Sequence, residues 1–306
     1  VSSENLGKNA GLISGGSLLI DYMLTVAVSV SAGAEAITSA VPALYGHQVA
    51  ISVTIVLLLM MLNLRGLRES ASFLLFPVYT FILVISLLIV VGLYNIVTGA
   101  VPLQATALPG AAVPGVSIAL ILRAFSSGSS SLTGVEAISN AVPFFKKPRA
   151  KNAAATLTMM ALILGFFFVG ITFINYWYGI VPEKEVTVLS QIGKAVFGHG
   201  ILYYVLQFAT ALILAVAANT GFSAFPVLAY NLAKDKFMPH MYQDRGDRLG
   251  YSNGIITLAL GSIVLLFIFH GSTERLIPLY SIGVFIPFAL SQTGMVVKWK
   301  KEGKRW

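Results

Sequence analysis

Long apolar runs constrain this chain more than any other feature of its sequence. Stretches such as "FILVISLLIVVGLYNIV" (81–97) and "MMALILGFFFVGITFINYW" (159–177) approach twenty residues without a charge, which is the length an α-helix needs to cross a bilayer. Only 10% of all residues are charged, whereas soluble domains carry about 25%. We therefore predict an all-α, polytopic membrane protein with a single transmembrane domain over 1–306, and a soluble enzyme is a remote alternative.

The apolar runs divide into eight predicted membrane spans. They lie near 10–34, 48–64, 71–97, 115–145 (interrupted), 152–180, 200–233, 253–270 and 275–297. Fifteen of the 20 Lys and Arg residues lie in four places, at 65–68, 146–151, 234–248 and 298–305. The positive-inside rule then places both chain ends in the cytoplasm, and the even number of spans agrees. The net charge of +8 therefore reports topology, and it gives no reason to expect a nucleic-acid partner.

One predicted span carries a row of oxygen-bearing side chains. In "LLIDYMLTVAVSVSAG", Thr25 and Ser29 follow Asp21 at i+4 and i+8, so the three lie on one helix face, flanked by Tyr22. Monovalent cations bind where oxygen ligands replace their hydration shell, and ionisable residues inside spans are functional candidates because their burial is costly. The alternative is that both hydroxyls bond back to the helix and that Asp21 pairs with Arg123.

A second polar feature interrupts the span at 115–145. The stretch "SSGSSS" (126–131) is a poor helix former in mid-membrane. If a half-helix restarts near Ser131 or Thr133, its positive dipole end favours Glu136 in the first turn, while Arg123 falls in the last turn of the preceding half. Transporters bind substrates and coupling ions at such discontinuous helices. A Ser/Gly packing seam against another helix is the alternative.

Other predicted spans contain weaker polar interruptions, and the sequence lacks several common catalytic motifs. The segment "AANTGFSAFP" (217–226) and the pair Tyr280 and Ser281 near Pro278 are candidate positions, with packing the favoured interpretation until their neighbours are known. The segment 181–199 is either a short amphipathic helix on the outer surface or an ordinary loop. The sequence has no P-loop, no Ser/His/Asp arrangement and no cysteine. We therefore predict no enzymatic activity and no cofactor.

Several motifs resemble one family over essentially the whole chain. They are "GLISGGSLLIDYMLTVAVSVSAG", "AFSSGSSSLTGVEAISNAVPFF", "AANTGFSAFP", "GDRLGYSNGI" and "LIPLYSIGVFIPFALSQTGM". These are similar to the KimA-type potassium importers of the KUP (potassium uptake permease) family, in the amino acid–polyamine–organocation (APC) superfamily. The resemblance implies a LeuT-like fold of five-plus-five inverted repeats, with twelve spans and a cytoplasmic C-terminal domain.

The resemblance also implies how this chain maps onto the family fold. The chain would cover family helices three to ten, with 10–97 as the last three helices of the first repeat and 115–297 as the second repeat. Helices one, two, eleven and twelve would be missing, and such a fragment should not transport by itself. The expected location is the plasma membrane of a bacterium. The resemblance further implies a homodimer held partly by the C-terminal domain.

Site residues carried over from the family come from four segments. The residues implied to bind or conduct the ion are Asp21, Tyr22, Thr25, Ser29, Thr133, Glu136, Gln191 and Tyr280. Potassium and protons would be the partners. We therefore predict a secondary active potassium importer, working as a K⁺/H⁺ symporter by alternating access. Two alternatives are an amino acid/proton symporter of the same superfamily and a membrane sensor that binds an ion without transporting it.

Overall fold

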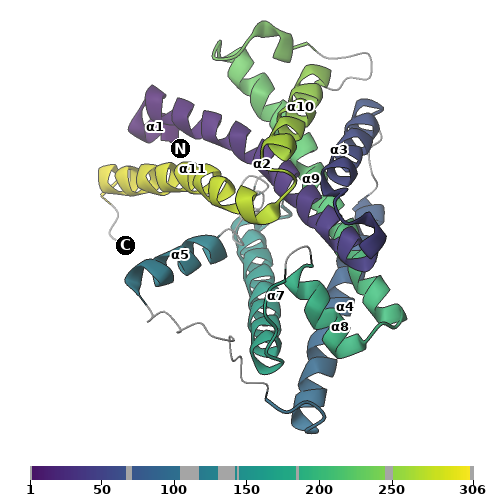
Figure 1. The fold of residues 1–306 in the computed structure, drawn as a ribbon. Coiled ribbons are helices and arrows are strands. Elements are labelled where there is room, and N and C mark those ends of the chain that lie inside the picture. Colours follow the sequence, from purple (N-terminus) through teal and green to yellow (C-terminus); the bar gives the residue numbers. More distant parts are fainter. Residues whose placement is uncertain are drawn as a thin grey trace. The chain divides into compact units, whose positions relative to one another are not determined.

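A computed structural model describes residues 2–66, 71–103, 117–129, 142, 145–183, 186–244 and 251–303. Over these ranges the chain is helical, with one isolated antiparallel bridge between Glu183 and Val186 (Figure 1). The α-helices are α1 (Ser2–Leu6), α2 (Lys8–Ala40), α3 (Gln48–Leu64), α4 (Ala71–Val97), α5 (Ile118–Ser129), α7 (Arg149–Trp177), α8 (Val188–Phe197), α9 (Ile201–Lys234), α10 (Ser252–Ile268) and α11 (Thr273–Lys301). Short 3₁₀ turns occur at Pro42–Leu44 and at η4 (His240–Tyr242).

The helices correspond to the predicted spans. Five of them, α2, α4, α7, α9 and α11, are long and apolar enough to cross a membrane. The 17-residue helices α3 and α10 are at the lower limit for crossing the hydrocarbon core. Helix α5 covers the first part of the span predicted to be interrupted, and it continues to Ser129, into the Ser/Gly stretch where the break was predicted. The rest of that span, apart from residues 142 and 145, lies outside the described residues. The all-α, polytopic membrane architecture is therefore confirmed.

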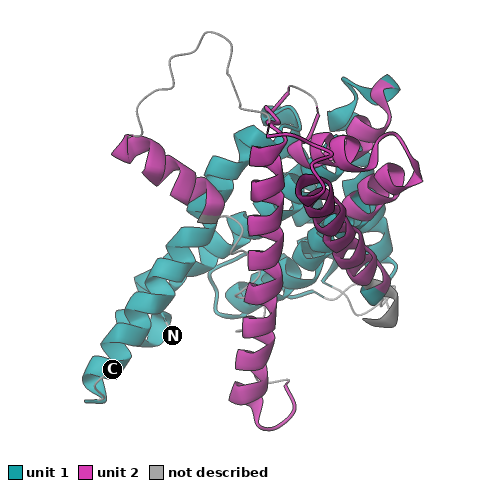
Figure 2. Ribbon diagram, turned by 90° about the horizontal axis from the view of Figure 1, so that it is seen from below, with its two compact units in different colours: residues 1–35, 43–75, 211–306 teal, residues 36–42, 76–210 magenta. Residues whose placement is uncertain are grey.

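The described chain forms two compact units, coloured separately in Figure 2. Unit 1 comprises 1–35, 43–75 and 211–306, and unit 2 comprises 36–42 and 76–210. These units are defined by packing, whereas the predicted repeats are defined by internal symmetry. The division of the chain into parts of two inverted repeats therefore stays a prediction.

The core of unit 1 is built around α2. Leu24 and Val26 of α2 are fully buried, and they belong to one apolar cluster with Phe222 of α9, Leu258 of α10 and Val284 of α11. From residue 21 to residue 40, α2 is buried or half-buried throughout, whereas Ile13 and Ile20 before this part are exposed. Small or polar residues on this second part of α2 are therefore enclosed by protein. This arrangement makes α2 the natural place for a buried polar site.

In unit 2, glycines allow α4 and α7 to pack closely. A Cβ atom at Gly92 would lie 2.7 Å from Cδ1 of Ile174, and one at Gly170 would lie 2.8 Å from Cδ1 of Ile89. Each helix thus offers a glycine to an isoleucine of the other, which is the small-residue packing typical of membrane helices.

The segment predicted to be either an amphipathic helix or a loop is a helix, α8. Its N-cap Thr187 accepts a hydrogen bond from the Ser190 amide at 3.1 Å, as capping residues commonly do. Ile192 is fully buried, and Gly193 lies against Leu206 of α9. The apolar face of α8 therefore packs on protein within unit 2.

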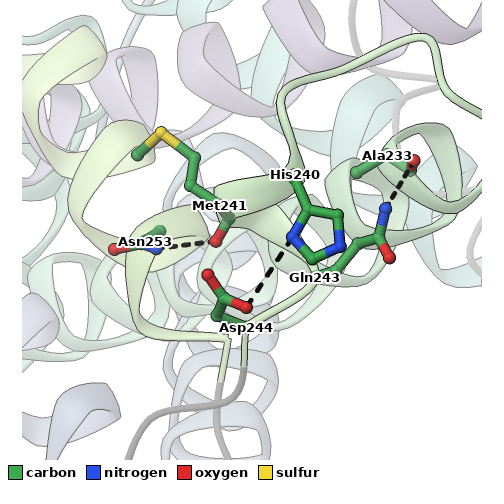
Figure 3. Close-up of polar contacts among 6 residues, drawn as sticks. All are labelled: Ala233, His240, Met241, Gln243, Asp244 and Asn253. Carbon is green, nitrogen blue, oxygen red and sulfur yellow. Dashed lines mark hydrogen bonds and ion pairs between the residues drawn. The ribbon is translucent and has the colours of Figure 1, made fainter.

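Side-chain amides fasten the connection between α9 and α10 to the ends of both helices (Figure 3). Gln243 Nε2 donates to the Ala233 carbonyl near the end of α9 at 2.7 Å. Asn253 Nδ2, in the first turn of α10, donates to the Met241 carbonyl at 2.6 Å. The basic segment predicted to be cytoplasmic is thus an ordered turn over the residues that the structure describes.

The structure corrects the end of the first predicted span. The span was placed near 10–34 and followed by a loop, but α2 continues to Ala40, so Glu35 lies within the helix. The reason is tertiary: a Glu35 carboxylate oxygen accepts a hydrogen bond from the Thr273 amide at 3.0 Å. Thr38 and Ser39, farther along the same helix, are also buried. Glu35 is therefore a further ionisable residue on the helix that carries Asp21.

Candidate functional site

The oxygen row predicted on α2 is enclosed within unit 1. Asp21 is 2% exposed and Ser29 9% exposed, and Thr25 is half-buried. The helix is continuous from Lys8 to Ala40, so successive members of the row lie about 6 Å apart along the axis. The row thus provides one carboxylate followed by two hydroxyls, all hard oxygen ligands.

The two hydroxyls of this row do not bond back to their own helix. Other hydroxyls of the chain do so with the carbonyl four residues earlier: Thr54, Thr80, Thr156, Thr158, Thr210, Ser281 and Thr293 donate at 2.7–3.0 Å. Among the described residues, neither Thr25 nor Ser29 makes such a bond, or a hydrogen bond to any other group. The alternative in which these hydroxyls serve only their own helix is therefore not what the structure shows.

Three neighbouring helices meet α2 at glycines beside this row. A Cβ atom at Gly221 of α9 would lie 3.3 Å from the Tyr22 carbonyl oxygen, and one at Gly261 of α10 would lie 2.6 Å from Sδ of Met23. One at Gly283 of α11 would lie 3.5 Å from Cα of Asp21. The absence of side chains at these glycines lets three backbones approach the level of Asp21, as is usual where membrane helices pack closely.

Two serines from other helices bond to the backbone of α2. Ser262 of α10 donates to the Met23 carbonyl at 3.1 Å, and Ser52 of α3 donates to the Val30 carbonyl at 3.4 Å. Both serines are fully buried. Interhelical hydrogen bonds of this kind hold membrane helices together. They fix α2 on either side of Thr25 and Ser29.

Tyr280 on α11 lies in the same core as α2. It is 7% exposed and shares the apolar cluster with Leu24, and Tyr22 packs against that cluster from α2. Tyr280 precedes Gly283 by three residues, which places the two on neighbouring positions of one helix face. Since the backbone at Gly283 passes close to Asp21, the structure brings Tyr280 to the part of unit 1 that contains the start of the row.

The polar segment predicted to interrupt the span at 200–233 does not break the helix, because α9 is continuous from Ile201 to Lys234. This segment is instead a packing element of the region. Asn219 accepts a hydrogen bond at 2.7 Å from Nδ2 of Asn63 on α3, and the same amide group donates to the Leu59 carbonyl at 2.8 Å. Asn219 lies two residues before Gly221, which meets the Tyr22 carbonyl. The amide pair therefore joins α3 to α9 near Tyr22.

Comparisons with known proteins now decide the family. The sequence model of the amino acid permease family matches residues 1–306. The chain belongs to this family. It is also 59% identical over 309 residues to the potassium transporter KimA of Bacillus subtilis (strain 168), covering 100% of this chain and 51% of KimA. The chain thus spans about half the length of the curated relative it matches, and the resemblance stated from the motifs is confirmed.

The remaining predicted site residues of this permease either belong to unit 2 or fall outside the described residues. Thr133 and Glu136 fall outside the described residues. Arg123 is exposed on α5, in unit 2. Gln191 is half-buried on α8. With its amide oriented so that both atoms are satisfied, it donates to the Val181 carbonyl at 2.9 Å and accepts from the Glu183 amide at 3.0 Å. A role in ion binding for Gln191, Thr133 and Glu136 stays a prediction.

Some residues of the region were missed by sequence reasoning. Ser52, Ser262 and Asn63 carry no local signal, because a single Ser or Asn in an apolar run does not identify its partner helix. Glu35 did carry a signal: it follows Asp21 by fourteen residues, which returns to within about 40° of the same helix face. The predicted span nevertheless ends at residue 34, just before Glu35.

Proposed function

We propose that this permease is a secondary active potassium importer that works by K⁺/H⁺ symport and alternating access, and that its α2 helix lines the ion path. The observation that carries the proposal is the buried row of Asp21, Thr25 and Ser29, whose hydroxyls are not used by the helix itself. The printed name of the relative at 59% identity, a potassium transporter, points to the same ion.

The chemistry of the row suits an alkali cation. Such an ion loses its hydration water only where several oxygen atoms replace it. Thr25 and Ser29 would supply neutral oxygen ligands, and the Asp21 carboxylate would compensate the positive charge. Tyr22 and Tyr280 would contribute from the same core, and Thr133, Glu136 and Gln191 stay predicted ligands.

Proton coupling would use the two carboxylates predicted to lie inside the membrane. If the cation neutralises one of Asp21 and Glu136, a proton can neutralise the other, so that the loaded site carries no uncompensated buried charge. Rocking of one helix group against another would then open the site to the cytoplasm, with Tyr280 as an inner gate. This scheme needs no cofactor.

Substitution of the row tests the proposal. In the full-length protein, Thr25→Val and Ser29→Ala should each raise the potassium concentration for half-maximal uptake about tenfold, because each removes one oxygen ligand. Asp21→Asn should reduce uptake to background, because the counter-charge is lost. Uptake is measured in cells that lack their own potassium importers and depend on the added transporter.

Thr54→Val is the matched control for this experiment. Thr54 is an exposed threonine of α3 whose hydroxyl donates to the Ala50 carbonyl at 2.8 Å, so its loss should leave uptake unchanged. If Thr25→Val and Ser29→Ala transport potassium as Thr54→Val does, the row does not bind the ion.

The description of the family, amino acid permease, favours a second candidate, an amino acid/proton symporter. A site for an amino acid would hold its carboxylate on bare backbone amides, as at the helix ends of related folds, whereas the α2 row presents a carboxylate of its own. Inhibition of uptake by amino acids in the same cells would favour that candidate. Potassium binding without any uptake would favour an ion sensor.

We further propose that the protein lies in the plasma membrane with both ends of this chain in the cytoplasm, as the distribution of basic residues favours. A homodimer remains the proposed assembly.

A further inference from the structure

The first turn of α11 lacks a cap from its own sequence. The first hydrogen bond within the helix runs from the Leu276 amide to the Ser272 carbonyl at 3.2 Å. Ser272 occupies the N-cap position, but its side chain makes no capping bond. Instead, the Thr273 amide donates to Oε1 of Glu35 at 3.0 Å. Because the first amides of a helix have no partner within it, Glu35 supplies the cap from a different helix.

The Glu35 contact and the Gly283 contact attach α11 to α2 at two levels. Glu35 and Asp21 are fourteen residues apart on nearly the same face of α2, about 21 Å along the axis, and Thr273 and Gly283 are ten residues apart on α11, about 15 Å. The second level is the close approach at Gly283, where an added Cβ atom would lie 3.5 Å from Cα of Asp21. Tyr280 lies on α11 between these two levels.

The segment between the two contacts is weakened by a proline. Pro278 lies inside α11, and it cannot donate the hydrogen bond that would close on the carbonyl four residues earlier. The first turn of α11 is therefore poorly held by its own backbone. An external acceptor at Thr273 compensates for this by fixing the start of the helix on α2.

We propose that Glu35 is a positioning residue: by accepting the Thr273 amide it holds the first turn of α11 on α2 and thereby sets Tyr280 beside the start of the Asp21 row. Glu35 itself does not contact the ion in this scheme. The consequence for transport rests on the proposed function, whereas the capping role does not.

Three substitutions in the full-length protein test this role. Glu35→Gln keeps an acceptor oxygen at the same position and removes the charge. Glu35→Met keeps the side-chain length and the helix propensity but removes the oxygen acceptor. Thr273→Pro removes the donor at a position where proline fits, because proline is favoured in the first turn of a helix, and Ser272 already has the extended backbone that precedes a proline (φ −89°, ψ 116°).

Two measurements follow each variant: hydrogen exchange of the peptide covering 273–279, and the potassium concentration for half-maximal uptake. Glu35→Met should raise the exchange rate of this peptide and the potassium concentration for half-maximal uptake about fivefold each, the size of effect expected for loss of a helix cap. The maximal rate of uptake should change little. Glu35→Gln should restore both to wild-type values. Thr273→Pro should resemble Glu35→Met in uptake, and the double variant should be no worse than either single variant, since both remove the same bond.

Thr293→Val is the control, because Thr293 is an exposed residue of α11 that is twenty residues from the first turn and whose hydroxyl donates to the Ala289 carbonyl at 2.7 Å, so its loss should change neither measurement appreciably. The proposal is overturned if Glu35→Met leaves exchange unchanged. It is also overturned if Glu35→Gln impairs uptake as strongly as Glu35→Met does, because Glu35 would then act through its charge. If the unmodified protein takes up no potassium, the proposed function fails, and the exchange measurement alone still decides the capping role.

Discussion

At the scale of single residues, the hydroxyls of Thr25 and Ser29 differ from those that bond back to their own helices. Thr25 and Ser29 leave their oxygen atoms available, whereas Thr54, Thr80 and Thr210 donate to their own helices. In a membrane, a hydroxyl group can find its hydrogen-bond partner in a carbonyl of its own helix. A hydroxyl group that does not donate to its own helix needs another partner. A cation that enters the row would be such a partner. The carboxylate and the two hydroxyls were predictable from i, i+4 spacing alone.

The amide pair between α3 and α9 gives a prediction at the same scale. Asn63→Leu leaves the Asn219 oxygen without its donor, and it should lower the free energy of unfolding by about 1 kcal/mol, as for other hydrogen bonds between membrane helices. Replacing both residues with leucine should recover part of this loss, because no unsatisfied polar group remains. Unfolding of the full-length protein in detergent measures both effects. Strictly additive losses would show that the two amides do not act as a pair.

At the scale of helices, glycines determine how closely α9, α10 and α11 approach α2. The contacts at Gly221 and Gly283 differ in tightness. A Cβ at Gly221 would lie 2.7 Å from Cγ2 of Val26 and 3.3 Å from a backbone carbonyl oxygen, which cannot move independently. A Cβ at Gly283 would meet nothing nearer than 3.5 Å. Glycine is therefore sterically required at position 221, whereas position 283 has room for a methyl group.

Alanine substitutions at these two glycines should accordingly differ in sign. Gly221→Ala should destabilise the protein by about 1–2 kcal/mol, because overpacking outweighs the gain in helix propensity. Gly283→Ala should be neutral or stabilise the protein by up to about 1 kcal/mol, since only the propensity gain remains. Thermal unfolding in detergent, with the two variants compared side by side, checks this order. A lower midpoint for Gly283→Ala than for Gly221→Ala would contradict it.

The sequence predicts the helices better than it predicts their contacts. The apolar runs located each span of the described chain, because a membrane helix must be apolar along its whole length. The end of α2 was misplaced because Glu35 was taken as a loop residue, when its partner is an amide 238 residues away. The glycine contacts and the serine bonds from α3 and α10 could not be predicted, because they depend on which helices are neighbours. Thr133 and Glu136 lie outside the described residues, so their part of the site stays a prediction.

At the scale of the whole molecule, the local features belong to a membrane protein of known family. The chain is a multi-pass membrane protein of the amino acid permease family, and it spans about half the length of KimA. Within it, α2 is the helix around which unit 1 is packed. A transporter needs an ion site that is enclosed by protein and bordered by helices able to shift. The α2 row, bordered by α9, α10 and α11, meets the first of these requirements.

The central claim, that α2 binds the transported ion, is tested most directly by locating a heavy potassium analogue in the full-length protein. Thallium(I) or rubidium bound to the purified transporter can be found by its anomalous scattering. We predict a site in direct coordination with Thr25, Ser29 and the Asp21 carboxylate, which disappears in Asp21→Asn and is displaced by potassium. Specific, potassium-displaceable density elsewhere, with none beside α2, would contradict the account.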